Sequence, residues 1–284
     1  MGLDPAAIKL NLELWKNAYF KDTHSVLELG SQGLHLNLAD FEELLGGAGI
    51  SDYKKEKFMA LAQWPNGPGC SSRAFYEALG LNEYACIDLN KKDGAIPLDL
   101  NYPLEDKSLF GKYDLVTDHG TNEHVFNTPQ AFHTMHKLCK PTGIMLISQA
   151  VFRGKGYYAY DPSFLEGMAA ANNYRILYSS FVINQFHVPL SWELMDTFDF
   201  TKMKGLRVFY AMQKQSEADF RTPYQGRFLS QNQKHLGFEV KYLQNPLSRA
   251  YAPLDTFKGI DDDALFGEFR KRLNKKIKKC LHLS

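Results

Sequence analysis

The chain has 284 residues, of which 44% are hydrophobic and 23% are charged, and its formal net charge at pH 7 is +1. This length buries one large core, with or without a small appendage. The balanced charge excludes a general nucleic-acid binder, which would carry a strong basic excess. Cys70, Cys86, Cys139 and Cys280 form no C-x-x-C pair, which indicates reduced thiols in a cytoplasmic protein.

The first predicted element is an amphipathic helix over residues 6–19, which would cap the core. Asp4, Lys9 and Glu13 interrupt its apolar residues, so the segment does not match a signal peptide. No run of about 18 apolar residues follows that would predict a membrane span.

The run Ser25 to Gly33, SVLELGSQG, predicts a short buried parallel strand that ends in a glycine turn. Gly30 and Gly33 allow the backbone to turn sharply and to approach a ligand where a Cβ would clash. Such a strand end points to a nucleotide-type ligand, although glycine turns also serve as plain connections.

Residues 34–70 form an insertion, because a connection from a strand to a helix normally takes about two to six residues. The segments 38–45 and 53–64 both have helical patterns. The insertion is either a lid over a cofactor or a surface excursion. We favour the lid, since the insertion leaves from the carboxyl end of a strand, where active sites assemble.

A helix is predicted from Ser71 to Leu79, and the strand after it, residues 84–88, ends in the carboxylate of Asp88. In doubly wound sheets an acid at this position accepts hydrogen bonds from ribose hydroxyls. A strand over 113–118, a helix over 129–138 and a strand over 144–148 continue the alternation. This order predicts an α/β fold with a parallel sheet covered on both faces.

These residues resemble the class I S-adenosylmethionine-dependent methyltransferases over roughly residues 20–215. The likeness rests on Glu28-Leu-Gly30-Ser-Gln, on Asp88, on Tyr113-Asp-Leu-Val with Glu123-His124-Val, and on Leu138-Cys-Lys-Pro-Thr-Gly143. The family pattern would have glycine at Gln32 and Leu34. The resemblance implies a doubly wound, Rossmann-like methyltransferase sheet of seven strands, the last one antiparallel, with helical insertions and a C-terminal helical tail.

The resemblance also implies S-adenosylmethionine as the cofactor, with a set of binding residues. Glu28 would orient the turn and the methionine amino group, and Asp88 would bind the ribose. The turn residues would line the methionine moiety, and later residues would contact the adenine. The remaining residues of the predicted cofactor-binding set are Gly30, Ser31, Gln32, Leu89, Asp99, Leu100 and Asp118.

A general base for methyl transfer should lie near the ends of the fourth and fifth strands. His119 is the first candidate, because histidine has the unperturbed pKa nearest neutrality. It is either this base or a histidine that only bonds the turn. Asp118 would orient it or contact the substrate, and His187 is the alternate base.

No metal site is predicted. Relatives with Glu-x-x-Glu-His at the position of Glu123 and His124 bind a divalent cation, but Gly120 replaces the first acid. His133 and His136 are spaced i, i+3 on one helix, yet no cysteine or nearby carboxylate completes a four-ligand set.

The predicted domains are a methyltransferase domain over 1–215 and a C-terminal extension over 216–284. A helix over 161–173 leads to strands at 175–183 and 206–212, which match an antiparallel hairpin, and the insertion 184–205 between them would flank the substrate pocket. In the extension, a helix over 261–283 carries seven bases among the ten residues 270–279. It is a packed structural helix, an anchor on an anionic membrane surface, or a docking site for an anionic partner.

Together these features predict a methyltransferase that acts on a small-molecule or glycan-type acceptor, at oxygen. Two alternatives stay open. The altered glycine turn is compatible with a non-catalytic scaffold on the same fold, and the strand-end glycines and acid are compatible with a dinucleotide-dependent oxidoreductase.

Overall fold

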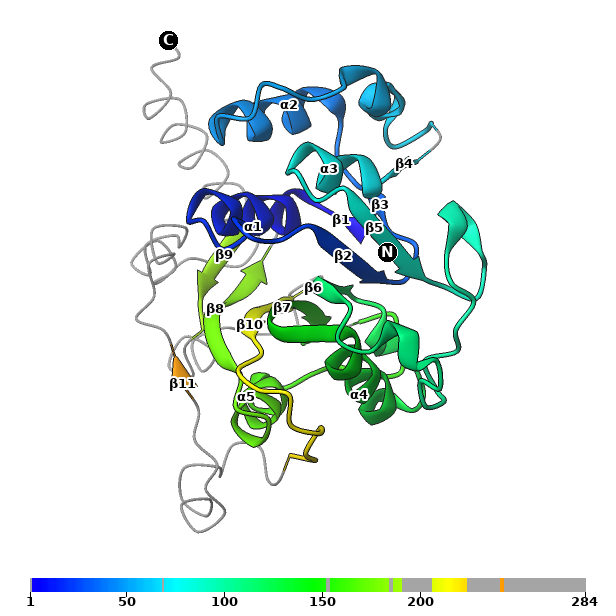
Figure 1. Ribbon diagram of the computed structural model, residues 1–284. Helices are drawn as coiled ribbons and strands as arrows, with labels where there is room; N and C mark the ends of the chain where they lie inside the picture. The colour runs from blue at the N-terminus through cyan, green and yellow to red at the C-terminus, as the bar shows by residue number, and fades with distance from the viewer. Residues whose placement is uncertain are drawn as a thin grey trace.

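The computed structural model describes residues 2–67, 69–151, 154–183, 186–190, 206–223 and 241–242. A central sheet organises them (Figure 1). Its strands are β2 (Ser25–Leu29), β5 (Glu83–Ile87), β6 (Tyr113–His119), β7 (Cys139–Ala150), β8 (Arg175–Ile183), β9 (Phe186–Pro189), β10 (Arg207–Gln213) and β11 (Lys241–Tyr242).

The strands lie in the order β11-β8-β10-β7-β6-β2-β5, and β9 pairs with β8. The pairs β2–β5, β2–β6 and β6–β7 are parallel, whereas β10 runs antiparallel to both β7 and β8. The sheet therefore extends from β2 to both sides, with β5 on one side and β6, β7 and the later strands on the other. This confirms the predicted α/β, doubly wound sheet with an antiparallel strand in its final hairpin.

Helices cover both faces of the sheet, as Figure 1 shows. The helices α1 (Pro5–Lys16) and α3 (Arg73–Ala78) share one hydrophobic core with Val26 of β2, and α4 (Thr128–Leu138) and α5 (Pro162–Ala171) share the other with Leu27. Neighbouring residues of a strand point to opposite faces. A strand such as β2, whose neighbouring residues Val26 and Leu27 enter different cores, is therefore what a sheet covered on both sides requires.

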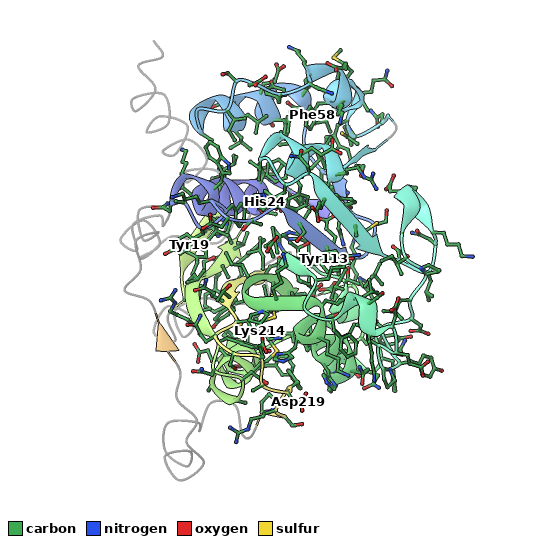
Figure 2. The ribbon with its side chains drawn as sticks, viewed as in Figure 1. Tyr19, His24, Phe58, Tyr113, Lys214 and Asp219 are labelled. Carbon is green, nitrogen blue, oxygen red and sulfur yellow. The ribbon has the colours of Figure 1, made fainter. Side chains whose placement is uncertain are left out.

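Residues 34–70 add a layer outside α1 and α3 (Figure 1). Phe41 and Phe58 of this insertion are buried in the same core as α1, and Phe58 marks the layer in Figure 2. The predicted lid over a cofactor stays a prediction.

The elements of this region are β3 (Gly33–Leu34), α2 (Leu38–Gly47), η1 (Lys55–Gln63) and β4 (Cys70–Ser71). Three short turns follow later in the chain: η2 (Lys92–Gly94), η3 (Lys107–Leu109) and η4 (Asn122–His124).

The chain's first strand, β1 (Gly2–Leu3), was not predicted from sequence. It pairs with β3, and β3 pairs with β4, to form a small second sheet. Asp4 follows directly: its side chain accepts a hydrogen bond from the N–H of Ala7 and caps α1, and it also forms an ion pair with Arg207 at the start of β10. The N-terminal segment is thereby tied to both sheets.

The segment after β10, residues 214–220, which we call the strap, packs against α4. The buried Lys214 donates to the carbonyls of His136 and Cys139, at 3.0 and 3.1 Å, and Figure 2 shows Lys214 and Asp219 in the lower part of the view. His133 stacks on Phe220 with 5.3 Å between ring centroids. His133 and His136 therefore pack against this strap.

Several predicted features lie outside the described residues. They include the helix over 261–283 and nearly all of the extension beyond residue 223, and only residues 186–190 of the insertion 184–205 are described. Within the described ranges, no helix has both the length and the apolar composition needed to cross a membrane.

We predict that Asp4→Ala lowers the free energy of unfolding by about 1–2 kcal/mol, because it removes a helix cap and an ion-pair partner. Asp4→Asn should cost less, since asparagine also caps helices. Urea denaturation of both variants measures the difference. Equal losses in the two variants would show that the charge matters and the cap does not.

Candidate functional site

The turn after β2 lies beside the end of β5, as the parallel register requires. Gly30 has a φ of +81°, a left-handed conformation that favours glycine. The N–H of Ser31 donates to Asp88 Oδ2 at 3.0 Å, and the Ser31 hydroxyl donates to Asp93 at 2.7 Å. Gly30, Ser31 and the half-buried Asp88 therefore lie together at this edge of the sheet, and their role in binding a cofactor stays a prediction.

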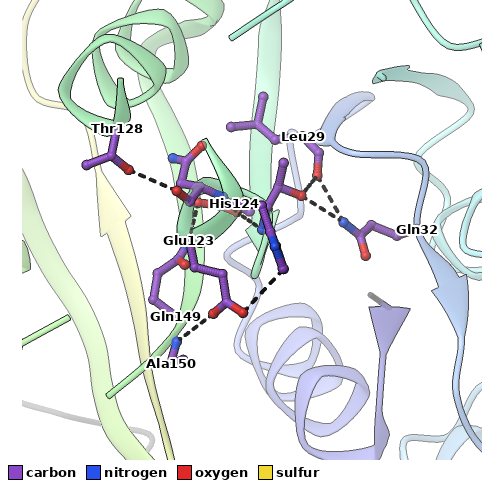
Figure 3. A network of polar contacts seen from close by, with 10 residues as sticks. Leu29, Gln32, Glu123, His124, Thr128, Gln149 and Ala150 are labelled. Carbon is purple, nitrogen blue, oxygen red and sulfur yellow. Dashed lines mark hydrogen bonds and ion pairs between the residues drawn. The ribbon is translucent and has the colours of Figure 1, made fainter. Parts of the chain in front are cut away.

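A polar network fixes this turn to the turn after β6, and Figure 3 shows it. The carbonyl of Leu29 accepts from the Thr121 hydroxyl at 2.6 Å and from the Gln32 amide at 3.0 Å. The Gln32 amide nitrogen also lies 3.1 Å from Thr121 Oγ1. Gln32 is buried, and its Oε1 has no hydrogen-bond partner among the described residues. Gln32 is thus a fixed part of the network that joins the two turns.

Glu28 is fully buried on the α3 side of the sheet. One oxygen, Oε2, accepts from the Tyr84 hydroxyl at 2.7 Å and from the hydroxyl of Ser72. The other, Oε1, has no partner within the described part of the chain. Burial raises the pKa of Glu28 to about 7, and the hydroxyls of Ser72, Tyr84 and Tyr76 oppose that rise.

Asp118 does not orient His119, and its predicted contact with the cofactor or substrate stays a prediction. Its Oδ1 accepts from the N–H groups of Thr121 and Asn122, at 2.8 and 3.3 Å, and its Oδ2 accepts from Gln149. It points to the face opposite His119, since the two are neighbours on one strand. Asp118 therefore shapes the turn after β6 and does not orient His119.

His119 ends β6 and is only 6% exposed. Its ring lies 6.1 Å from that of Phe209, and neither ring nitrogen has a hydrogen-bond partner among the described residues. Burial, with a smaller contribution from Arg207, lowers its pKa to about 4. His119 is thus a neutral imidazole with both nitrogens available.

His187 is occupied on both sides. Its Nδ1 lies 2.8 Å from the Ser180 hydroxyl and its Nε2 lies 2.9 Å from the carbonyl of Ala6. Burial lowers its pKa to about 4. These contacts leave no ring nitrogen for an acceptor, so of the two predicted bases the structure favours His119.

The residues predicted to hold an adenine differ in accessibility. Leu89 is 62% exposed directly after Asp88, whereas Leu100 is buried in the core. Asp99 is half-buried, and its Oδ1 accepts from the N–H and the amide of Asn101, at 2.9 and 2.8 Å. Leu89 can contact a ligand, while Asp99 and Leu100 support the loop behind it.

Glu123 and His124 belong to the turn after β6 (Figure 3). Glu123 Oε2 accepts from the N–H of Ala150 at 3.2 Å, and Oε1 lies 3.4 Å from His124 Nε2. The pair links the turn after β6 to the end of β7. Across the described residues, no group of three or more His, Cys, Asp or Glu side chains is arranged to hold a metal ion.

The sequence reasoning missed several residues of the site. Thr121, Ser72 and Tyr84 carry no motif, and only the fold brings them to Gln32 and Glu28. The helix-capping role of Asp4 was also missed, but here the sequence holds a signal: an aspartate followed by Pro5 is a recognised helix start.

No protein-family model matches the chain, and no curated protein matches it. Solved structures similar to it include a 1,6-didemethyltoxoflavin-N1-methyltransferase from Burkholderia thailandensis, 11% identical with a TM-score of 0.37, covering 73% of this chain and 80% of that one. Another is an S-adenosylmethionine-dependent methyltransferase from Archaeoglobus fulgidus, 12% identical with a TM-score of 0.38, covering 74% and 94%. The [4+2]-cyclase SpnF is 14% identical with a TM-score of 0.35, covering 74% and 81%.

We predict that Gly30→Ala destabilises the protein more than Gly49→Ala does. Both glycines have a φ near +80°, but a Cβ at Gly30 would lie 2.6 Å from Thr121 Oγ1 and 2.8 Å from Gln32 Nε2, whereas nothing lies within 4 Å at Gly49. Gly49→Ala therefore reports left-handed strain alone, of about 1–2 kcal/mol. Denaturant unfolding of both variants measures the excess, and equal losses would show that the network yields without cost.

Proposed function

We propose that the chain is an S-adenosylmethionine-dependent methyltransferase that acts on an oxygen atom of a small-molecule or glycan-type acceptor. The observation that carries this proposal is the pairing of the Gly30–Gln32 turn with Asp88 at the adjacent ends of β2 and β5. Doubly wound sheets bind nucleotide ligands at the carboxyl ends of such strands.

The residues present fit this cofactor. Asp88 receives one backbone N–H on each oxygen, from Ser31 and Asn90. A carboxylate accepts about four hydrogen bonds, so two positions remain for ribose hydroxyls. The unpaired, buried Oε1 of Gln32 is a ready acceptor for an ammonium group. The exposed Leu89 offers an apolar surface to a base.

When bound, S-adenosylmethionine supplies a methyl group on a positively charged sulfur. The chain's own residues would hold the two reactants in line, which supplies much of the rate acceleration. His119 would take the acceptor's proton, since its imidazole is neutral at pH 7 and both nitrogens lack partners in the described structure. The Leu29–Gln32–Thr121 network would keep the cofactor turn and the base in fixed relative positions.

Calorimetry with S-adenosylmethionine, S-adenosylhomocysteine, NAD and NADP tests the proposal directly. We expect binding of both sulfur nucleotides and none of the dinucleotides. Binding of a dinucleotide alone would favour the oxidoreductase. Binding of no nucleotide would favour the non-catalytic scaffold.

We predict that Asp88→Ala weakens S-adenosylhomocysteine binding by about tenfold or more, because hydrogen bonds to a charged group contribute about 1.5–3 kcal/mol each. Calorimetry on the folded variant gives the change. Asp106→Ala is the matched control: its carboxylate also binds a local N–H, that of Ser108, but it lies before η3, ahead of β6. Unchanged affinity in Asp88→Ala would reject the ribose assignment.

A further inference from the structure

Four buried side chains on the α3 side of β2 and β6 carry polar atoms whose hydrogen bonding within the described structure is incomplete. The atoms are Glu28 Oε1, Tyr76 Oη, Thr117 Oγ1 and both ring nitrogens of His119. The first three residues are fully buried and His119 is 6% exposed. Buried polar groups in native proteins are nearly always paired with protein or with ordered water, so a run of unpaired atoms indicates internal water.

The strand register places these atoms along one line. Glu28 lies opposite Thr117 in the parallel pair of β2 and β6. His119 is two residues beyond Thr117 on the same strand, and therefore on the same face. Tyr76 of α3 faces both Glu28 and Thr117: besides the burial that raises the pKa of its hydroxyl, hydrogen bonding with Thr117 lowers that pKa, whereas the charge of Glu28 and hydrogen bonding with it raise it. We name Glu28, Tyr76, Thr117 and His119 the polar track.

The two ends of the polar track differ in their surroundings. At the inner end, Ser72 and Tyr84 hold Oε2 of Glu28, which leaves Oε1 for the track. At the outer end, His119 sits at the carboxyl edge of the sheet between Phe209 and the Asp4–Arg207 ion pair. The track thus runs from the candidate base to a buried carboxylate.

We propose that ordered water completes the polar track and that the track carries the acceptor's proton from His119 to the Glu28 carboxylate. The inference rests on the proposed function for the source of that proton. The acceptor oxygen forms a bond to the methyl carbon, and the broken carbon–sulfur bond leaves its electron pair on sulfur. The acceptor proton moves to one nitrogen of His119, the other nitrogen releases its proton to water, and Glu28 becomes a neutral carboxylic acid.

The protonation energetics agree with this direction. Burial lowers the pKa of His119 to about 4 and raises that of Glu28 to about 7, so Glu28 holds a proton more tightly. Asp93 adds to the rise at Glu28. At His119, Arg207 lowers the pKa further and Asp4 opposes it. Because Glu28 must begin ionised, the track works above pH 7 and fails as the pH falls below it.

An infrared pH-jump experiment on the full chain tests the track without any acceptor. The pH is moved from above to below the pKa of Glu28, and the carboxylic acid band is followed in time, with Glu28→Gln identifying the band. Thr117→Val, which keeps the shape and removes the hydroxyl, should slow protonation of Glu28 by about tenfold or more. Thr117→Ser should restore the rate. Thr134→Val is the control, because Thr134 is equally buried but lies in α4.

Each result decides the proposal. Slowing in Thr117→Val with rescue by serine supports it, and an unchanged rate overturns it, because the proton then reaches Glu28 by another path. Slowing in both Thr117→Val and Thr134→Val would also overturn it, since general loosening would explain the effect. Binding of S-adenosylhomocysteine is measured separately. A working track without nucleotide binding would remove the proposed function alone, and binding with an unchanged protonation rate would remove the track alone.

Discussion

The carbonyl of Leu29 is the point on which the candidate site depends. It is the last residue of β2, and its oxygen accepts hydrogen bonds from Gln32 in its own turn and from Thr121 in the turn after β6. A backbone acceptor in a buried strand end cannot move without disturbing the sheet. Two loops that are far apart in the sequence therefore have one fixed relation, which a site for two reactants requires.

Burial has opposite effects on the two titratable groups of this edge. A carboxylate loses more by leaving water than a carboxylic acid does, and an imidazolium loses more than an imidazole. The same sheet face consequently favours protonated Glu28 and neutral His119. In the proposed polar track, this difference makes Glu28 a stronger proton acceptor than His119.

The N-terminal segment and the insertion show how this chain elaborates the common sheet. β1 adds to β3, and Asp4 reaches across to Arg207 at the start of β10. Because β10 is antiparallel, its first residue lies at the carboxyl edge of the parallel strands, beside His119. The charges of the Asp4–Arg207 ion pair therefore act on His119.

The sequence by itself determined the elements and the order in which they follow one another. The apolar residues of β2 and β6, the glycine turn and the acid at Asp88 are local signals, so the doubly wound sheet was predictable from it. The hydrogen bond from Ser31 to Asp88 forms because the parallel register of that sheet brings the ends of β2 and β5 together. The strand β1, the bonds of Gln32, the hydrogen-bond partners of Asp118 and the occupied nitrogens of His187 were decided by tertiary structure alone. The physical reason is that a side chain's partners come from segments distant in sequence, and only the packed sheet fixes which polar atoms are paired and which remain free for a ligand.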